Sequence, residues 1–377
     1  MMRYDGKAPR AVWPKRSGAW LSPSAHYRLR PEDPKVVVLG GGSGSSAVLQ
    51  GLKRHTAQIT AIVTMFDSGG SSGLLREEFG FPPFGDLRQC LMALSEEFGP
   101  AATLQSLLGF RFDEDSSLHG HNLGNLMLAA LTSLYDVEGA IDQLSRALRV
   151  RGRVAPVSLD PADLGAELED GTFLRGEAAI DLRGSPRPRI ARLFLDPAAK
   201  ANPRAVQAIL EADAVILGPG DLFTSILPNL LVDGIPQALS RTRARLIYVC
   251  NLMTKPGETD DFTASDFLGA LNCYLGDASI EWAIVNTAPV PRAIREVYAR
   301  QGAFPVEADV ERLARHGIKS RVGAFANGQI PLRHDPEPLA EVILSLIDSE
   351  WLPGDGLLLS EMQQVRDLRE AVVGYWS

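Results

Sequence analysis

The fold is decided by residues 35–52, which read KVVVLGGGSGSSAVLQGL. Apolar residues at 36–39 run directly into glycines and serines at 40–46, and apolar residues then recur at helical spacing over 47–52. This order predicts a buried strand, a tight glycine turn and a helix. A helix that begins in a glycine turn points unpaired backbone N–H groups outward, and the glycines let an anion approach them closely. The stretch therefore predicts a site for a phosphate-bearing ligand.

The spacing of this turn fits one variant of the dinucleotide-binding fingerprint. Gly42, Gly44 and Ala47 match the pattern G-x-G-x-x-A. The pattern alone is not specific, because a closely packed strand-to-helix turn that binds nothing has the same composition. Both interpretations stay open at this point.

Composition indicates an ordinary globular enzyme or binding protein. The chain has 377 residues, of which 45% are hydrophobic and 22% are charged. Residues 1–30 carry seven Lys or Arg against one Asp, whereas the whole chain has a net charge of −8. The acidic remainder argues against a nucleic-acid-binding core. Apolar runs are too short for a membrane span, and no signal peptide is evident, so we expect a cytoplasmic protein.

Further strands are followed by loops of similar composition. The strand expected at 59–65 precedes FDSGGSSG, the strand at 214–217 precedes GPGDLFTS, and the strand at 245–249 precedes the polar loop 250–259. With the strand at 282–286 and helices between, this rhythm predicts a doubly wound, mostly parallel, Rossmann-like sheet. In such sheets ligands gather at the carboxyl ends of the strands. We therefore expect these loops to form one site.

The chain divides into three parts by composition. Residues 1–34 form a basic N-terminal extension, residues 35–349 form the α/β nucleotide-binding domain, and residues 350–377 form a helical C-terminal extension. Within the domain, short strand-like runs at 154–159, 172–174 and 190–194 predict a small antiparallel insertion at about 153–200.

Several polar residues are candidates for chemistry, each with a structural alternative. Asp86 precedes an apolar helical pattern and is either a helix cap or a carboxylate aimed into the cleft. Asp67 and Asp86 together could hold Mg²⁺ beside a diphosphate. Alternatively, Asp86 is a cap and Asp67 accepts a hydrogen bond from a ribose or from the backbone. Asn125, like Asn122, lies near the apolar stripe formed by Leu123, Leu126, Met127, Ala130, Leu131 and Leu134, which we expect to face the core. Each amide then needs a backbone or ligand partner.

Long motifs in order along residues 35–349 identify a family resemblance. They are GGGSG, TMFDSGGSSGLLR, PPFGDLRQCLMAL, GHNLGNLMLAAL, ILGPGDLFTSILPNLL and YVCNLMTKPGETDDFTASDFL. The chain closely resembles the gluconeogenesis factors (YvcK-like), bacterial relatives of the 2-phospho-L-lactate transferase (CofD-like) family. The resemblance implies a protein of the cytoplasm, needed for growth and cell shape on gluconeogenic carbon sources. It also implies a UDP-sugar ligand such as UDP-N-acetylglucosamine and a regulated partner in cell-wall precursor metabolism.

The resemblance also implies which residues form the site. The ligand-binding residues it indicates are Gly41, Gly42, Ser43, Gly44, Ser45, Asp67, Gly69, Gly70, Ser71, Ser72, Asn125, Gly218, Gly220, Asp221, Thr224, Asn251, Thr254, Tyr298 and Arg333. Asp67 and Asp86 are the expected catalytic and Mg²⁺-binding residues if the chain is an enzyme. A homodimer is a further expectation.

Two departures from the family pattern bear on the choice of function. The family usually has two adjacent acids where this chain has Asp67 and Ser68, and an arginine where it has Leu74. The loss of one acid and one cation favours ligand binding over catalysis. The principal hypothesis is therefore a nucleotide-sugar-binding regulator, and the alternative is a Mg²⁺-dependent phospholactyl-type transferase. An NAD(P) dehydrogenase is a third hypothesis, supported by the first glycine loop alone.

Overall fold

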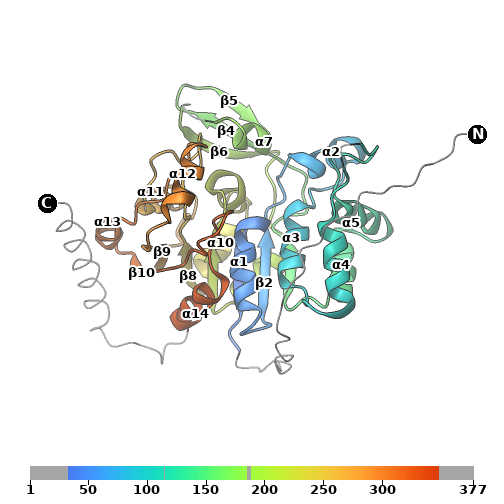
Figure 1. The fold of residues 1–377 in the computed structure, drawn as a ribbon, viewed down its shortest axis with the longest axis horizontal. Coiled ribbons are helices and arrows are strands. Elements are labelled where there is room, and N and C mark those ends of the chain that lie inside the picture. The colour runs from blue at the N-terminus through green and yellow to red at the C-terminus, as the bar shows by residue number, and fades with distance from the viewer. Residues whose placement is uncertain (1–32, 114, 185–187, 348–377) are drawn as a thin grey trace, which may run out of the picture.

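A seven-stranded parallel sheet forms the centre of the protein (Figure 1). The computed structural model describes residues 33–113, 115–184 and 188–347. The sheet has the order β10-β9-β8-β7-β1-β2-β3. Its strands are β1 (Val36–Gly40), β2 (Ile59–Val63), β3 (Arg153–Pro156), β7 (Ala214–Leu217), β8 (Arg245–Val249), β9 (Trp282–Asn286) and β10 (Lys319–Gly323).

The central strands are buried along their whole length, as a parallel sheet covered on both faces requires. All five residues of β1 are buried, and Val36 aligns with Ile59 of β2 on one side and with Ala214 of β7 on the other. The continuous aliphatic run at 36–39 thus has the composition of a central strand rather than of an alternating edge strand.

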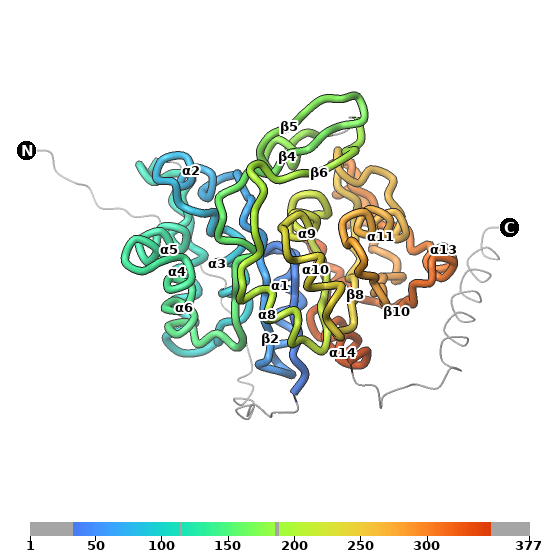
Figure 2. The backbone as a smooth tube through the Cα atoms, turned by 180° about the vertical axis from the view of Figure 1, so that it is seen from behind, coloured from blue at the N-terminus to red at the C-terminus, as the bar shows by residue number. Residues whose placement is uncertain are grey.

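Helices cover both faces of the sheet (Figures 1 and 2). One face carries α1 (Gly42–Leu52), α3 (Gly85–Leu94) and α14 (Pro336–Ile347), and the other carries α8 (Pro203–Leu210) and α10 (Ile235–Arg241). Four helices gather at the end beyond β3: α2 (Gly70–Phe79), α4 (Gly99–Gly109), α5 (Leu123–Leu134) and α6 (Val137–Ala147). The opposite end holds α11 (Ala264–Asn272), α12 (Arg292–Ala299) and α13 (Val310–Arg315).

A small antiparallel sheet lies above the carboxyl ends of the main strands (Figure 1). It consists of β4 (Asp163–Leu168), β5 (Phe173–Arg175) and β6 (Ile190–Asp196), with helix α7 (Glu177–Asp181) between the last two. We call residues 163–196 the insertion. The run at 154–159 was expected in this sheet, and that expectation is wrong, because β3 pairs in parallel with β2. Burial of Val154 and Ala155 suits the main sheet better than an exposed hairpin.

The apolar stripe of α5 faces the core less than its sequence predicts. The residues of α5 that are buried are Gly124, Asn125, Leu128 and Ala129, whereas Leu134 is 76% exposed. The cause is a polar contact, since the amide oxygen of Asn125 accepts a bond of 3.0 Å from the buried guanidinium of Arg88. Orienting Asn125 inward turns the leucine stripe partly outward.

The two terminal extensions, at 1–34 and 350–377, lie almost entirely outside the described residues, which begin at Asp33 and end at Ile347. In the described part of the chain, no helix combines the length and the apolar character that crossing a bilayer requires.

Candidate functional site

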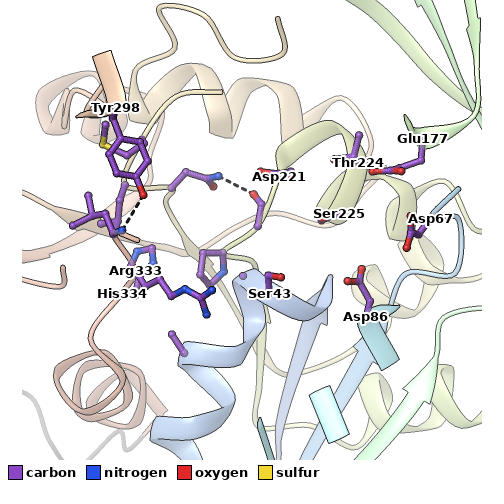
Figure 3. Close-up of a pocket in the computed structure, with 18 residues that line it drawn as sticks. Ser43, Asp67, Asp86, Glu177, Asp221, Thr224, Ser225, Tyr298, Arg333 and His334 are labelled. Carbon is purple, nitrogen blue, oxygen red and sulfur yellow. Dashed lines mark hydrogen bonds between the residues drawn. The ribbon is translucent and has the colours of Figure 1, made fainter. Parts of the chain in front are cut away.

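The strand order reverses between β1 and β7, and a cavity lies where the loops after these two strands diverge. From β1 the sheet continues through β2 and β3 in one direction, and from β7 it continues through β8, β9 and β10 in the other. Ligands of open α/β proteins bind at such a switch point. The cavity has a volume of about 400 Å³, which is in the range of small-molecule sites (Figure 3).

Two glycines of the first turn are required by contacts within the protein. A methyl group at Gly44 would lie 2.1 Å from the carbonyl oxygen of Pro219, and one at Gly42 would lie 2.7 Å from the Cα of Asp86. Helix α1 therefore packs directly against the loop after β7 and against α3. These contacts account for both glycines of the fingerprint, so the pattern gives no separate support to an NAD(P) dehydrogenase.

Asp86 is a cavity residue and not a helix cap. Helix α3 begins at Gly85 after Phe84, and no side chain caps it. The Asp86 carboxyl lines the cavity with Asp67 (Figure 3). Burial, reinforced by the negative charge of Asp67, raises the pKa of Asp86 to about 7. A carboxyl group that titrates near neutrality in a cleft is typical of a functional site.

A third carboxyl group, that of Glu177, comes from helix α7 of the insertion. It lines the same end of the cavity as Asp67 and Asp86 (Figure 3). Burial raises the pKa of Glu177 to about 8, with further contributions from Asp67 and Asp181. Sequence reasoning did not find Glu177, because the insertion reaches the cavity only through tertiary packing.

Hydroxyl groups line the wall between the two strand loops. Thr224 and Ser225 lie on a short π-helix, η1 (Leu222–Ile226), a conformation that is frequent at functional sites. Thr224 is only 4% exposed, and its hydroxyl has no hydrogen-bond partner among the described residues. Asn251 connects the loop after β8 to the loop after β7, because its side-chain amide donates a bond of 2.8 Å to the carbonyl oxygen of Gly220.

The opposite end of the cavity is aromatic and cationic (Figure 3). The hydroxyl of Tyr298 accepts a bond of 2.8 Å from the backbone N–H of Leu332, which fixes the loop that carries Arg333. The exposed guanidinium of Arg333 has no acidic partner among the described residues. Burial lowers the pKa of the adjacent His334 to about 4, so this imidazole is neutral and lies 3.1 Å from the carbonyl oxygen of Cys250.

The cavity brings together about half of the residues expected from sequence. Those that line it are Ser43, Gly44, Asp67, Asp86, Gly220, Asp221, Thr224, Asn251, Tyr298 and Arg333. Those that do not line it are Gly41, Gly42, Ser45, Gly69, Gly70, Ser71, Ser72, Asn125, Gly218 and Thr254. The lining residues that sequence reasoning missed are Ala47, Glu177, Pro219, Ser225, Leu252, Met253, Leu332 and His334. Several of these neighbour a predicted residue in sequence, which is the signal that could have found them.

Several of the residues that do not line the cavity bond to the scaffold instead. The Ser71 hydroxyl accepts from the N–H of Asn122, the Ser72 hydroxyl from that of Gly85, and the Thr254 hydroxyl from that of Phe304. These bonds hold the loops in place around the cavity. A direct contact of these side chains with ligand stays a prediction.

Asp67 and Asp86 suit a Mg²⁺ ion only if a ligand completes its coordination. The charge of Asp67 raises the pKa of Asp86, so a cation beside both would relieve their repulsion. Among the described residues, no cluster of three or more His, Cys, Asp or Glu side chains could hold a metal ion. Two carboxylates together with phosphate oxygens are, however, a common Mg²⁺ environment. These two residues would hold the ion, which would then neutralise charge on a bound diphosphate.

Comparison with known proteins places the chain in a family. The sequence model of a family described as 2-phospho-L-lactate transferase CofD matches residues 36–326. The gluconeogenesis factor of Bacillus subtilis is 41% identical over 84% of this chain and 99% of that protein. The chain belongs to the gluconeogenesis factors of the CofD family. The resemblance stated from the motifs is thereby confirmed.

A further relative agrees in sequence, and a solved structure agrees in fold. The gluconeogenesis factor of Halalkalibacterium halodurans is 43% identical over 82% of this chain and 95% of that protein. A crystal structure of a member of the UPF0052 family from Bacillus halodurans is 42% identical, covers 83% of this chain and 99% of that chain, and has a TM-score of 0.78. The predicted fold, a doubly wound parallel sheet with a small antiparallel insertion, is confirmed.

Proposed function

We propose that this gluconeogenesis factor binds a nucleotide sugar of the UDP-N-acetylglucosamine type and acts as a regulator of growth under gluconeogenic conditions. Relatives named gluconeogenesis factors support the role in growth. The match to a transferase family named for a phosphorylated substrate supports a phosphate-bearing ligand. The observation that carries the proposal is the polarity of the cavity, which runs from an aromatic and cationic end to an end rich in carboxyl and hydroxyl groups (Figure 3).

This polarity suits the three parts of a nucleotide sugar. The side chains of Leu252, Met253 and Tyr298 offer an apolar and aromatic surface for a base. Arg333 supplies a cation for the diphosphate near Ser43 and Gly44 at the start of α1, where backbone N–H groups favour anions. The remaining end offers hydrogen-bond partners for sugar hydroxyls.

Asp221 lies in the middle of the cavity, but its negative charge is paired and therefore repels a diphosphate less than an unpaired carboxylate would. Its carboxylate lies 2.7 Å from the ammonium group of Lys255. The pairing leaves the guanidinium of Arg333 as a cation available to the ligand.

Isothermal titration calorimetry with the full chain tests the proposal. We expect UDP-N-acetylglucosamine to bind, and we expect Arg333→Ala to weaken binding about tenfold, because one charge-assisted contact is lost. Arg292→Ala, a change at an exposed arginine paired with Glu296, is the matched control and should leave affinity unchanged. Binding of a different nucleotide with no response to UDP-N-acetylglucosamine would reject the proposed ligand.

The remaining parts of the proposal concern the cell. We place the protein in the cytoplasm, with a role in cell shape and with a regulated partner in cell-wall precursor metabolism, and we expect a homodimer. Growth of a deletion strain on gluconeogenic carbon and on glucose, with cell shape recorded, tests the physiological role. Equal growth and shape on both would contradict it.

A Mg²⁺-dependent transferase is the alternative, and the titration of Asp86 near neutral pH favours it. In this function an acceptor hydroxyl would form a new P–O bond to the phospholactyl group while the bond to the nucleoside monophosphate breaks, and Asp86 would take the hydroxyl proton. The chain would then turn over a nucleoside-diphosphate-linked donor. Absence of any released nucleoside monophosphate in the presence of donor, acceptor and Mg²⁺ would exclude it.

A further inference from the structure

Helix α7 of the insertion is fastened to the cavity at both of its ends. At its start, the Ser68 N–H lies 3.5 Å from the Glu177 carboxylate, and the Ser68 hydroxyl accepts a bond of 3.0 Å from the N–H of Ala178. At its end, Asp181 pairs with Lys255, which also pairs with Asp221 on the cavity wall. The insertion is therefore a fixed wall of the site.

The start of α7 faces an unpaired hydroxyl. Helix α7 packs against η1, on which Thr224 lies. Figure 3 shows Glu177 and Thr224 next to each other at the carboxyl-rich end of the cavity, with Asp67 beside them. Thr224 is more than nine-tenths buried and its hydroxyl has no partner among the described residues. A buried hydroxyl without a partner carries a free-energy cost that a ligand hydroxyl or amide would remove.

We propose that Glu177 and Thr224 recognise the terminal group of the ligand, that this group is neutral and bears hydroxyls or an amide, and that the insertion thereby determines ligand specificity. This inference rests on the proposed function. It assigns the sugar of the nucleotide sugar to this end of the cavity and gives the insertion a direct role in binding.

The charges around Glu177 favour a neutral terminal group over an anionic one. Asp67 and Asp181 face it as carboxylates, and Lys255 is the cation near it. A terminal carboxylate or phosphate would meet Asp67 and Asp86 directly, and the ammonium group of Lys255 is already paired with Asp181, Asp221 and Glu258. The Glu177 carboxyl group lines the cavity and accepts hydrogen bonds, and the Thr224 hydroxyl both donates and accepts them. Hydroxyl and acetamido groups also do both.

Calorimetry with two probes, UDP and UDP-N-acetylglucosamine, tests the inference on the full chain. The wild type should bind the nucleotide sugar more tightly than UDP. Glu177→Ala should weaken the nucleotide sugar about 10- to 30-fold, as expected for the loss of a strong hydrogen bond, and should change UDP affinity less than about twofold. Thr224→Val, which keeps the shape of the side chain, should show the same selectivity with a smaller loss. Thermal unfolding of each variant establishes that it folds.

The matched variants decide between recognition and a structural role. Glu169→Ala removes an exposed acid from the same insertion and should leave both affinities unchanged. Glu177→Gln keeps the size of the side chain and one acceptor oxygen, so it should retain more affinity for the nucleotide sugar than Glu177→Ala. If Glu177→Ala lost equal affinity for UDP and for the nucleotide sugar, or lost none, the inference would be overturned and the proposed function would stand. Failure of the wild type to bind either probe would overturn the proposed function and the inference together.

Discussion

At the scale of single residues, Asp86 should make stability depend on pH. Its folded pKa of about 7 lies above its ordinary value of 3.8 because of burial and the nearby Asp67. An acid with a raised folded pKa stabilises the fold most when protonated, below pH 4, and this contribution is lost as pH rises from about 4 to 7. Asp86→Asn mimics the protonated form, so we expect it to raise the free energy of unfolding by about 2 kcal/mol at pH 8 and by little at pH 4.

Urea unfolding at pH 4, 6 and 8 measures this difference, with Asp136→Asn as the comparison, because Asp136 caps α6 through the N–H of Gly139. We expect Asp136→Asn to show no increase in the free energy of unfolding, relative to the wild type, that grows between pH 4 and pH 7. A gain for Asp86→Asn that is equal at all three values would contradict the burial of an ionisable carboxyl.

The sequence could not choose between the two roles of Asp86, since a cap and a cleft carboxylate both precede an apolar helix. The choice depends on where Gly41 and Gly42 pack, and both lie against Asp86. Glu177 was harder to predict than Asp86, because nothing in the sequence of residues 176–181 indicates that α7 packs against the loop that carries Asp67.

At the scale of elements, helix α1 packs so closely against the loop after β7 that we expect no side chain to fit at Gly44. A Cβ there would lie 2.1 Å from a backbone oxygen of Pro219, so backbone must move. Gly44→Ala should lower the free energy of unfolding by about 2 kcal/mol or more. Gly269→Ala in α11, where a Cβ meets no atom within 4 Å, should instead raise it by up to about 1 kcal/mol through helix propensity. Chemical denaturation of both variants gives the comparison, and a neutral Gly44→Ala would contradict the close packing.

The periodicity of apolar residues predicted the positions of helices and strands better than it predicted which of their faces are buried. The aliphatic run of β1 is buried as expected, because a central parallel strand needs no polar face. In α5 the pattern pointed to the leucine stripe, but the bond from Arg88 to Asn125 and the close approach of Gly124 to Leu108 select a different face. A polar pair between distant segments leaves no periodic signal, so the orientation of such a helix follows only from the tertiary structure.

At the scale of the molecule, the convergence of loops followed from chain order, whereas the docking of the insertion did not. Strands that alternate with helices must be parallel, and their carboxyl ends share one edge. The adjacency of β1 and β7 then creates the switch point at which the cavity lies. No such rule determines the position of the insertion, because its antiparallel sheet could lie anywhere that a long connection allows. Lys255 is one of the contacts that settle its position.

Lys255 should couple the insertion to the parallel sheet. Its ammonium group pairs with Asp181 of α7, with Asp221 at 2.7 Å and with the buried carboxylate of Glu258 at 2.9 Å. Burial raises the pKa of Glu258 to about 7 although Lys255 opposes the shift, so removal of the ammonium leaves a buried carboxylate unpaired above neutral pH. We therefore expect Lys255→Met to lower the free energy of unfolding by about 2 kcal/mol at pH 8 and by less at pH 5, where Glu258 takes up a proton.

The same substitution should loosen the insertion before the main sheet. Hydrogen exchange followed by mass spectrometry should show faster exchange over α7 and β4–β6 in Lys255→Met, with β1 and β7 protected as in the wild type. Lys35→Met removes an exposed lysine that lies 3.8 Å from Glu211, and an exposed pair of this kind should change stability by less than about 0.5 kcal/mol. If exchange in the insertion were the same in Lys255→Met, Lys35→Met and the wild type, its attachment would depend on the contacts of Ser68 and η1 with α7, and Lys255 would serve the cavity wall alone.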